Sequence, residues 1–221
     1  MTQFHIKQST LDAMLLIAAK KDIRYYLNGV YIEFNDQITR AVGCDGHKLG
    51  IYQTAVPSSN TGAGSLIIPR DVIENLPKAG KNTHLISITQ NDTGAGWTIN
   101  TGATTVGFTP YDDKYPDFRR VVHGLQTAGT TGVAAGFNLT YLNEFEKCGN
   151  LLAGSKLKVG NRLRLHHNGD AAGLVLLNCV DGFAGVVMPL RDSLGSTGAL
   201  FPAQLTSELT ATHENNAALA A

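Results

Sequence analysis

The residues Asp92-Thr93-Gly94-Ala95 of this chain spell the tetrapeptide that surrounds the catalytic aspartate of aspartic proteases. That chemistry needs two carboxylates that share one proton, one from each half of a molecule or from each of two subunits. The protease tetrad follows an apolar strand, whereas the polar run 89–91 precedes it here. Because Asn, Asp and Gly between two strand-like runs favour a tight turn, we interpret this segment as a hairpin connection. An aspartic protease is therefore the weaker alternative.

Asp45 and His47, and the neighbouring pair His166-His167, carry side chains of the kind that bind metal ions. Neither group has a third ligand at a suitable spacing, which a zinc site needs. We interpret His47 as a residue at a chain corner, and the histidine pair as strand residues on opposite faces. The sequence also lacks a phosphate-binding P-loop. We therefore predict no metal, no cofactor and no enzymatic activity.

The charge of the chain is balanced, with 18 Lys and Arg against 18 Asp and Glu. This argues against a protein that coats nucleic acid through bulk charge, although a neutral protein can still carry a local basic surface. The three cysteines, Cys44, Cys148 and Cys179, form no Cys-x-x-Cys pair. With no signal-peptide pattern, they predict reduced thiols and a cytoplasmic protein. No apolar run approaches the roughly 20 residues that cross a bilayer, so we expect no membrane association.

Hydrophobic periodicity and turn residues divide the chain into three groups of elements, each about 55 residues long. Each group is predicted to hold a short strand, a helix and three strands. The predicted strands are 2–7, 22–34, 38–42, 49–52, 65–68, 85–89, 97–100, 104–108, 157–166, 173–179 and 183–190. Segment 111–122 is predicted to be irregular and then extended.

The helices of these groups are predicted to start at Ser9 or Thr10, at Pro69 and at Asn138. Two of them carry inward apolar stripes, at Leu11, Met14, Leu15 and Ala18, and at Leu139, Leu142 and Phe145. A βαβββ unit cannot bury both its helix and its sheet edges alone, so the units should pair side by side. The predicted fold class is α+β, with helices on one face of antiparallel sheets.

A family resemblance is carried by DIRYYLNGVYIEF followed by CDGHKLGIY, then SLIIPRDVIENL and KYPDFRRVV. In this order and spacing, residues 8–122 resemble the middle domain of the bacterial beta sliding clamp, the processivity ring of the replicative DNA polymerase. GFNLTYLNEF and VVMPLR resemble parts of the last half of the clamp's third domain. The resemblance implies the DNA-clamp, or processivity, fold.

The chain resembles one and a half clamp domains, which is typical of a shortened phage, prophage or plasmid version. The resemblance implies a middle-domain-like region at 1–123, a linker at 124–133, a half-domain at 134–191 and a flexible tail at 192–221. Clamp rings contain twelve such units, so three units in each chain predict a homo-oligomer of four chains around duplex DNA. DNA polymerase, other proteins with clamp-binding motifs and a clamp loader are the implied partners.

The resemblance also implies two binding surfaces. The first is a hydrophobic cleft for partner peptides, in which Cys44 replaces a small hydroxyl residue typical of the family. Its implied residues are Leu27, Cys44, Gly46, His47, Lys48, Leu49, Pro116, Arg120, Val121, Val186, Met188, Pro189, Leu190 and Arg191. The second surface would contact DNA phosphates without reading sequence. Its implied residues are Lys20, Lys21, Arg24, Tyr25 and Tyr26.

Two alternatives keep this fold. Lys20 and Lys21 at a helix end can simply complement the helix dipole in solvent. The chain can also be a non-ring adaptor or decoy that occupies the clamp-binding motifs of host replication proteins. Leu200-Phe201 in the tail ends as many clamp-binding peptides do, which gives the hypothesis that the tail occupies a cleft.

Overall fold

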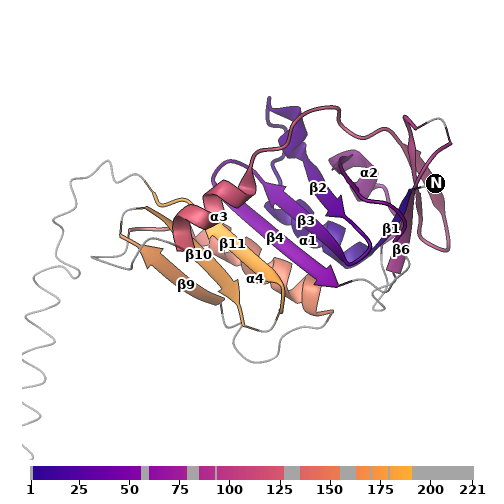
Figure 1. Cartoon of the computed structure of the whole chain (residues 1–221). Coiled ribbons are helices and arrows are strands. Elements are labelled where there is room, and N and C mark those ends of the chain that lie inside the picture. The colour runs from indigo at the N-terminus through magenta and orange to yellow at the C-terminus, as the bar shows by residue number, and fades with distance from the viewer. Residues whose placement is uncertain are drawn as a thin grey trace, which may run out of the picture. The chain divides into compact units, whose positions relative to one another are not determined.

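The computed structural model describes residues 2–55, 60–78, 85–92, 94–126, 135–154, 163–169, 171–178 and 180–190. Contacts divide the chain into a compact unit, Met1–Pro189, and a second unit that begins at Leu190. All helices and strands named below belong to the first unit (Figure 1). Among the described residues, no helix is long and apolar enough to cross a membrane.

The first unit alternates short strands with helices. The strands are β1 (Gln3–Lys7), β2 (Gly29–Phe34), β3 (Ile38–Cys44), β4 (Lys48–Ala55), β5 (Gly64–Pro69), β6 (Leu85–Gln90), β7 (Trp97–Asn100), β8 (Thr105–Phe108), β9 (Leu163–Asn168), β10 (Ala171–Leu177) and β11 (Phe183–Val187). The helices are α1 (Gln8–Ile17), α2 (Arg70–Glu74), α3 (Phe118–Gln126) and α4 (Leu139–Ala153), with a 3-10 turn, η1 (Tyr25–Asn28).

The strands form two antiparallel sheets, in the orders β1-β6-β7-β8 and β5-β2-β3-β4-β11-β10-β9. The first strands of the first two predicted groups are exchanged, because β1 pairs with β6 and β5 pairs with β2. The third group joins the first because β11 pairs with β4. In this pairing Val186 lies opposite Leu49. The predicted α+β class and the side-by-side pairing of the units are confirmed.

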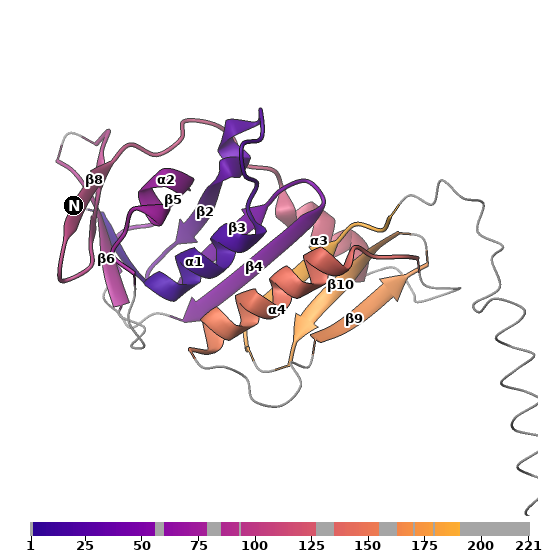
Figure 2. The ribbon, with the colours of Figure 1, turned by 180° about the vertical axis from the view of Figure 1, so that it is seen from behind.

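Helices cover both faces of the seven-stranded sheet. α1 and α4 lie side by side on one face, and α3 lies on the opposite face (Figures 1 and 2). Two glycines allow the close approach, since an added Cβ at Gly43 would lie 2.3 Å from the Met14 carbonyl oxygen. A Cβ at Gly185 would lie 2.6 Å from the Phe145 ring. α1 and α4 can therefore approach the sheet this closely at Gly43 and Gly185 because glycine has no side chain.

Alternation along the strands gives the sheet two apolar layers. Ala41 and Val187 belong to the larger cluster under α1 and α4, whereas the adjacent Val42 and Val186 belong to the cluster on the α3 face. The buried members of this second cluster are Ala19, Leu27, Val42, Leu49, Ile67, Tyr115, Phe118 and Val186. The sheet thus has no polar face over much of its width.

Several predicted boundaries were wrong. α1 begins at Gln8 and has no side-chain cap, so Ser9 and Thr10 lie inside it as buried residues. Its start is held instead by packing and by the Gln8 amide, which donates to the Pro77 carbonyl oxygen at 2.6 Å. Leu139 is 78% exposed, because the first position of α4 faces away from the sheet.

The segment predicted as a strand from residue 22 is a loop and the η1 turn as far as Asn28. Asn28 closes this loop by accepting from the Asp22 N–H and donating to the Asp22 carbonyl, both at 2.8 Å. Residues 118–126 are helical rather than extended. Phe118 packs into the second cluster, and this tertiary contact favours the helix.

Two local predictions were confirmed, and several others concern residues that the structure does not describe. Asn138 caps α4, since its Oδ1 accepts from the Thr140 N–H at 2.9 Å. The segment around Asp92 is the turn of the β6–β7 hairpin, closed by Asn91 N–H to the Gly96 carbonyl at 2.9 Å. Predictions that lie outside the described residues are those for Thr93, 127–134, 157–162, Cys179, Arg191 and the tail 192–221, with Leu200-Phe201.

One arginine fixes the end of α1. The last carbonyl groups of a helix have no partner within it. The Arg70 Nη2 donates to the carbonyl oxygens of Leu15 at 2.9 Å, Ala18 at 3.1 Å and Ala19 at 2.9 Å. Its Nη1 pairs with Glu74 at 3.0 Å. These hydrogen bonds from Arg70 fix the point where the chain leaves α1 and enters the loop toward Leu27.

We predict that Arg70→Met lowers the free energy of unfolding by about 2–3 kcal/mol, because these half-buried carbonyl groups lose a charged donor. Urea unfolding followed by circular dichroism measures the loss. Glu74→Gln is the matched control and should cost less than about 1 kcal/mol, since that ion pair is half exposed. A loss no larger than that of the control would show that Arg70 does not hold the helix end.

Candidate functional site

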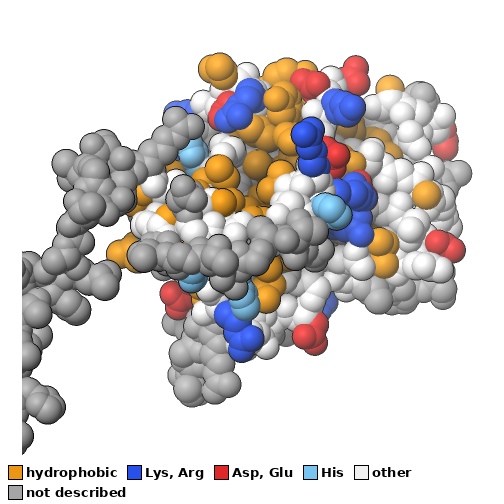
Figure 3. Space-filling model, turned by 60° about the vertical axis from the view of Figure 1, so that its left-hand side comes forward, with side chains coloured by type: hydrophobic (Ala, Val, Ile, Leu, Met, Phe, Trp, Pro, Cys, Tyr) orange, Lys and Arg blue, Asp and Glu red, His pale blue; other side chains and the backbone are white. Residues whose placement is uncertain are grey.

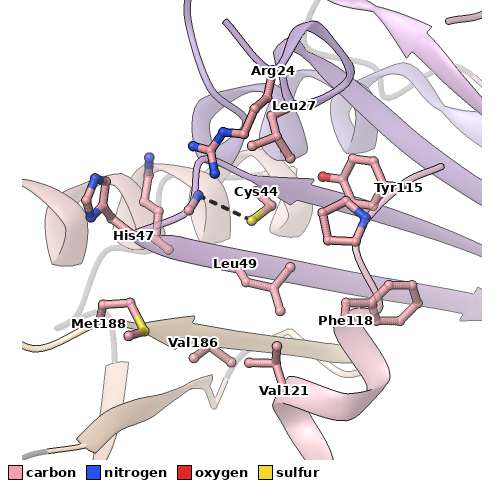
Figure 4. Close-up of a pocket in the computed structure, with 13 residues that line it drawn as sticks. Arg24, Leu27, Cys44, His47, Leu49, Tyr115, Phe118, Val121, Val186 and Met188 are labelled. Carbon is pink, nitrogen blue, oxygen red and sulfur yellow. Dashed lines mark hydrogen bonds between the residues drawn. The ribbon is translucent and has the colours of Figure 1, made fainter. Parts of the chain in front are cut away.

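A cavity of about 250 Å³ opens on the α3 face of the seven-stranded sheet. Figure 4 shows its lining side chains, which come from the η1 turn, the β3–β4 corner, β4, α3 and the end of β11. The structure brings ten of the fourteen predicted cleft residues together here: Leu27, Cys44, Gly46, His47, Lys48, Leu49, Pro116, Val121, Val186 and Met188. Arg24, Tyr115 and Phe118 complete the lining.

Three adjacent strands build the apolar floor. Cys44 on β3 is opposite Leu49 on β4, and Leu49 is opposite Val186 on β11. These side chains therefore form a row across the sheet. Val121 from α3 and Met188 after β11 are 45% and 46% exposed. Leu49 and Val186 are thus buried in the floor, while Val121 and Met188 present large apolar groups to solvent. Figure 3 shows hydrophobic side chains gathered on one face of the molecule.

The β3–β4 corner holds the polar end of the cavity. The Asp45 Oδ1 accepts from the N–H groups of His47 and Lys48, both at 2.8 Å. Gly46 has a φ of 91°, which favours glycine. The Met188 N–H donates to the His47 carbonyl at 2.8 Å. The corner is therefore fixed both by its own turn and by the strand that follows β11.

Lys48 connects this corner to α4. Its side chain is 5% exposed, and its ammonium group pairs with Asp45 and with Glu144, the latter at 3.1 Å. The same ammonium lies 5.2 Å from the centre of the Tyr141 ring, on which His47 stacks at 6.1 Å. The charge of Lys48 is thus paired inside the protein, while its hydrocarbon chain lines the cavity.

Arg24 was predicted to contact DNA, but the structure places it at the cavity. Its Nη2 lies 2.8 Å from Asp22 Oδ2 and 3.4 Å from the Asp45 carbonyl oxygen. The hydrogen bonds from Arg24 lower the pKa of the Asp22 carboxyl to about 2. Arg24 therefore joins the η1 loop to the corner as well as forming part of the rim.

The other residues predicted for DNA contact lie beside Arg24 along the same loop. Lys20 and Lys21 are exposed, and Lys21 has a φ of 60°. Tyr25 is 46% exposed, and its hydroxyl donates to the Asp112 carbonyl at 3.4 Å. Tyr26 is half-buried and packs edge to face on Tyr25. The loop thus exposes Lys20, Lys21, the partly exposed Arg24 that pairs with Asp22, and the Tyr25 ring.

Two predicted cleft residues that the structure describes in the first unit do not line the cavity. Arg120 is exposed on α3, and Pro189 is half-buried after β11. Leu190 belongs to the second unit, and Arg191 lies outside the described residues. Sequence reasoning missed Tyr115 and Phe118, although both stand in the YPDFRR run that pointed to Pro116 and Arg120. An aromatic residue on each side of Pro116-Asp117 was the available signal.

Glu33 positions α3, which carries Phe118 and Val121. Its carboxylate accepts from Arg119 at 2.5 and 2.9 Å and from Arg40 at 2.6 Å. Burial alone would raise the pKa of Glu33, but the hydrogen bonds from the two arginines outweigh it and hold the pKa below its usual value. This arrangement ties the start of α3 to β2.

The chemical groups needed for metal binding are not assembled in the part of the chain that is described. No group of three or more His, Cys, Asp and Glu side chains that could hold a metal ion occurs there. Asp45 is engaged by the corner and by Lys48, and His166 and His167 lie on the edge strand β9. What the cavity offers is an apolar floor and rim with Arg24 and His47 at one end.

The protein-family model for the central domain of the DNA polymerase III beta subunit matches residues 5–117, just over half of the 221-residue chain. The chain belongs to the DNA polymerase III beta subunit family. The beta sliding clamp of Pseudomonas putida is 32% identical over 123 residues, which are 53% of this chain and 33% of that protein. That of Escherichia coli K12 is 29% identical over 127 residues, or 54% and 33%. The match thus spans about a third of these relatives.

Solved structures extend the similarity beyond the matched domain. The DNA polymerase sliding clamp of Pseudomonas aeruginosa aligns with a TM-score of 0.60 over 86% of this chain and 67% of that one, at 22% identity. The beta subunit of Thermotoga maritima aligns with a TM-score of 0.61 at 15% identity, over 86% and 66%. At these identities the comparison establishes the clamp fold for this family member.

We predict that Glu33→Gln lowers the free energy of unfolding at pH 7 by about 1 kcal/mol, a figure that allows for the exposure of Arg119. Because the pKa of Glu33 is lowered on folding, its contribution is present above the ordinary value of 4.5 and is lost as the pH falls below it. Urea unfolding between pH 7 and pH 3 should therefore show the difference from wild type shrinking.

Glu146→Gln is the control for this pH series, because Glu146 is exposed on α4. It should unfold like wild type at each pH. A difference for Glu33→Gln that stays constant down to pH 3 would contradict the role of the ionised carboxylate.

Proposed function

We propose that this chain is a sliding-clamp processivity factor without enzymatic activity. It encircles duplex DNA as a homo-oligomeric ring and tethers DNA polymerase and other proteins that carry clamp-binding motifs. A clamp loader places it on DNA. The observation that carries the proposal is the convergence of ten predicted cleft residues around one apolar cavity. Its relatives in Pseudomonas putida and Escherichia coli are named beta sliding clamps, which supports the same conclusion.

The cavity suits the anchoring side chains of an extended peptide. Its floor is formed by Cys44, Leu49 and Val186, and ligand sites are typically concave, apolar and furnished with a few polar groups. Exposed Val121 and Met188 can cover an apolar side chain once it has entered. Leucine and phenylalanine side chains are the expected anchors, because their burial supplies the binding free energy.

The sheet edges support assembly into a ring. β8 ends the smaller sheet and β9 ends the larger one. An uncovered edge strand presents unpaired backbone groups, which another chain can satisfy. We propose that copies join through these edges and that four copies supply the twelve units of a ring. Lys20, Lys21 and Tyr25 are the residues we propose to meet DNA phosphates.

A non-ring adaptor or decoy is the second candidate, and the charges of the helix layer favour it. The charged residues of α1 and α4 are Asp12, Glu144, Glu146 and Lys147, so these two helices carry more negative than positive groups. Helices that line a DNA channel should neutralise phosphates instead. In this candidate the cleft binds clamp-binding motifs, and the chain does not encircle DNA.

We predict that Met188→Ala weakens binding of a fluorescent Gln-Leu-Ser-Leu-Phe peptide by about tenfold, which is about 1.4 kcal/mol. Met188 is 46% exposed, so its truncation should leave the fold intact. Fluorescence anisotropy measures the affinity. Leu139→Ala removes a residue of similar size, 78% exposed on α4, and should change nothing. Equal affinities for both variants would reject the cleft as the peptide site.

We predict a single species at four times the 23.5 kDa chain mass in light scattering across a concentration series. Such a species should also stay on nicked circular DNA and leave it after linearisation, since a ring can slide off an end. A monomer or dimer that still binds the peptide would reject the ring and support the adaptor or decoy.

A further inference from the structure

The first strand of each group pairs according to one rule. The groups are β1-α1-β2-β3-β4, then β5-α2-β6-β7-β8, and then α4-β9-β10-β11. In the first two groups, the strand that follows the helix takes the first strand of the other group, since β2 pairs with β5 and β6 pairs with β1. β9 follows the helix of the third group, and in the described part of the chain it has no such neighbour. The uncovered edge of β9 therefore suits a first strand.

The last strands of the groups follow a second rule. β4 ends the first group and β11 ends the third, and these two strands pair antiparallel with each other. β8 ends the second group, and among the described residues it pairs on one side only, with β7 (Figure 2). The edges of β8 and β9 are therefore of different kinds. A joint between β8 and β9 would combine unlike edges, whereas a joint between two last strands already exists within this chain.

β8 also lacks the features that protect an uncovered edge. Exposed edge strands usually carry a lysine or a proline that prevents pairing with another chain, and residues 105–108 include neither. The other ends of the two sheets are partly covered. On β1, Gln3 exchanges two backbone hydrogen bonds with Thr61, at 3.0 and 2.8 Å. On β5, the Ile67 carbonyl accepts from the Tyr111 N–H at 3.1 Å. The edge of β8 is thus suited to pairing with another strand.

We propose that β8 pairs antiparallel with β8 of a second copy around a two-fold axis, in the way that β11 pairs with β4. This proposal rests on the proposed ring and names its joint. A two-fold interface brings each residue close to its own counterpart. An edge without charged residues therefore avoids the repulsion of like charges that face each other across two strands. The β9 edges are left for the joint between two third groups.

The two-fold joint has a consequence for the clefts. For both copies to turn Lys20, Lys21 and Tyr25 toward the DNA, the two-fold axis must be perpendicular to the DNA axis. A rotation about such an axis reverses the direction of the DNA axis. Neighbouring copies would then carry their clefts toward opposite faces of the ring. Partner proteins would therefore bind on both faces of this ring.

The test places charges at one position of the β8 edge. An added Cβ at Gly107 would have no neighbouring atom within 4 Å among the described residues, so Gly107→Glu and Gly107→Lys should fold. Each variant alone brings two like charges together at a β8–β8 joint, whereas an equal mixture brings opposite charges together. Leu85→Glu and Leu85→Lys are the controls, since Leu85 is 49% exposed on β6, which is paired on both sides. Light scattering measures the molar mass, and circular dichroism melts check the fold.

We expect wild type and both Leu85 controls to give four times the 23.5 kDa chain mass. Each Gly107 variant alone should give half of that mass, because the β9 edges still join two copies. The equal mixture should recover the full mass and associate about tenfold more tightly than either variant alone.

A head-to-tail joint between β8 and β9 gives a different result. Both Gly107 variants would then fall to monomers, and Gly107→Glu would associate better than Gly107→Lys, because it would meet the exposed Arg164 on β9. That result, or the full mass in every variant, would show that this proposal is wrong while the ring stands. If wild type is a dimer, the ring fails, and the β8 joint stands only if both variants lose the dimer and their mixture recovers it. A wild-type monomer rejects both.

Discussion

The antiparallel pairing of β11 with β4 holds together two parts of the chain that are far apart in sequence. It places Val186 beside Leu49 to form the cavity floor, and it lets α4 pack beside α1 on the other face. It also brings the Met188 N–H to the His47 carbonyl, which closes the polar corner. Without this pairing, the strands before β5 would end at an exposed apolar edge at β4, and the cavity would lack one wall.

The same strands serve both layers of the molecule. Because neighbouring residues point to opposite faces, Val186 lines the cavity while Val187 contributes to the core beneath α1 and α4. Lys48 links the layers electrostatically, since its side chain lines the cavity and its ammonium pairs with Glu144 on α4. A change in how α4 packs would therefore alter the β3–β4 corner of the cavity.

Sequence reasoning worked where local chemistry decides the structure. The chain corner at His47 and the cap at Asn138 depend on side chains that bond nearby backbone groups, so they could be predicted. It failed where packing overrides local preference. The helix at 118–126 forms because Phe118 enters the second cluster, and α1 starts at Gln8 because the first turn is buried.

The sequence by itself determined the family, the α+β class and most of the residues that line the cavity, since the quoted motifs and the strand periods are local features. Only the tertiary structure decided that Arg24 lines the cavity and that the Lys48 ammonium pairs with Glu144 as well as with Asp45. It alone showed that β1 and β5 are exchanged between two groups and that β8 ends a sheet. These facts depend on which side chains meet across sheets and helices, and such contacts have no fixed spacing along a chain.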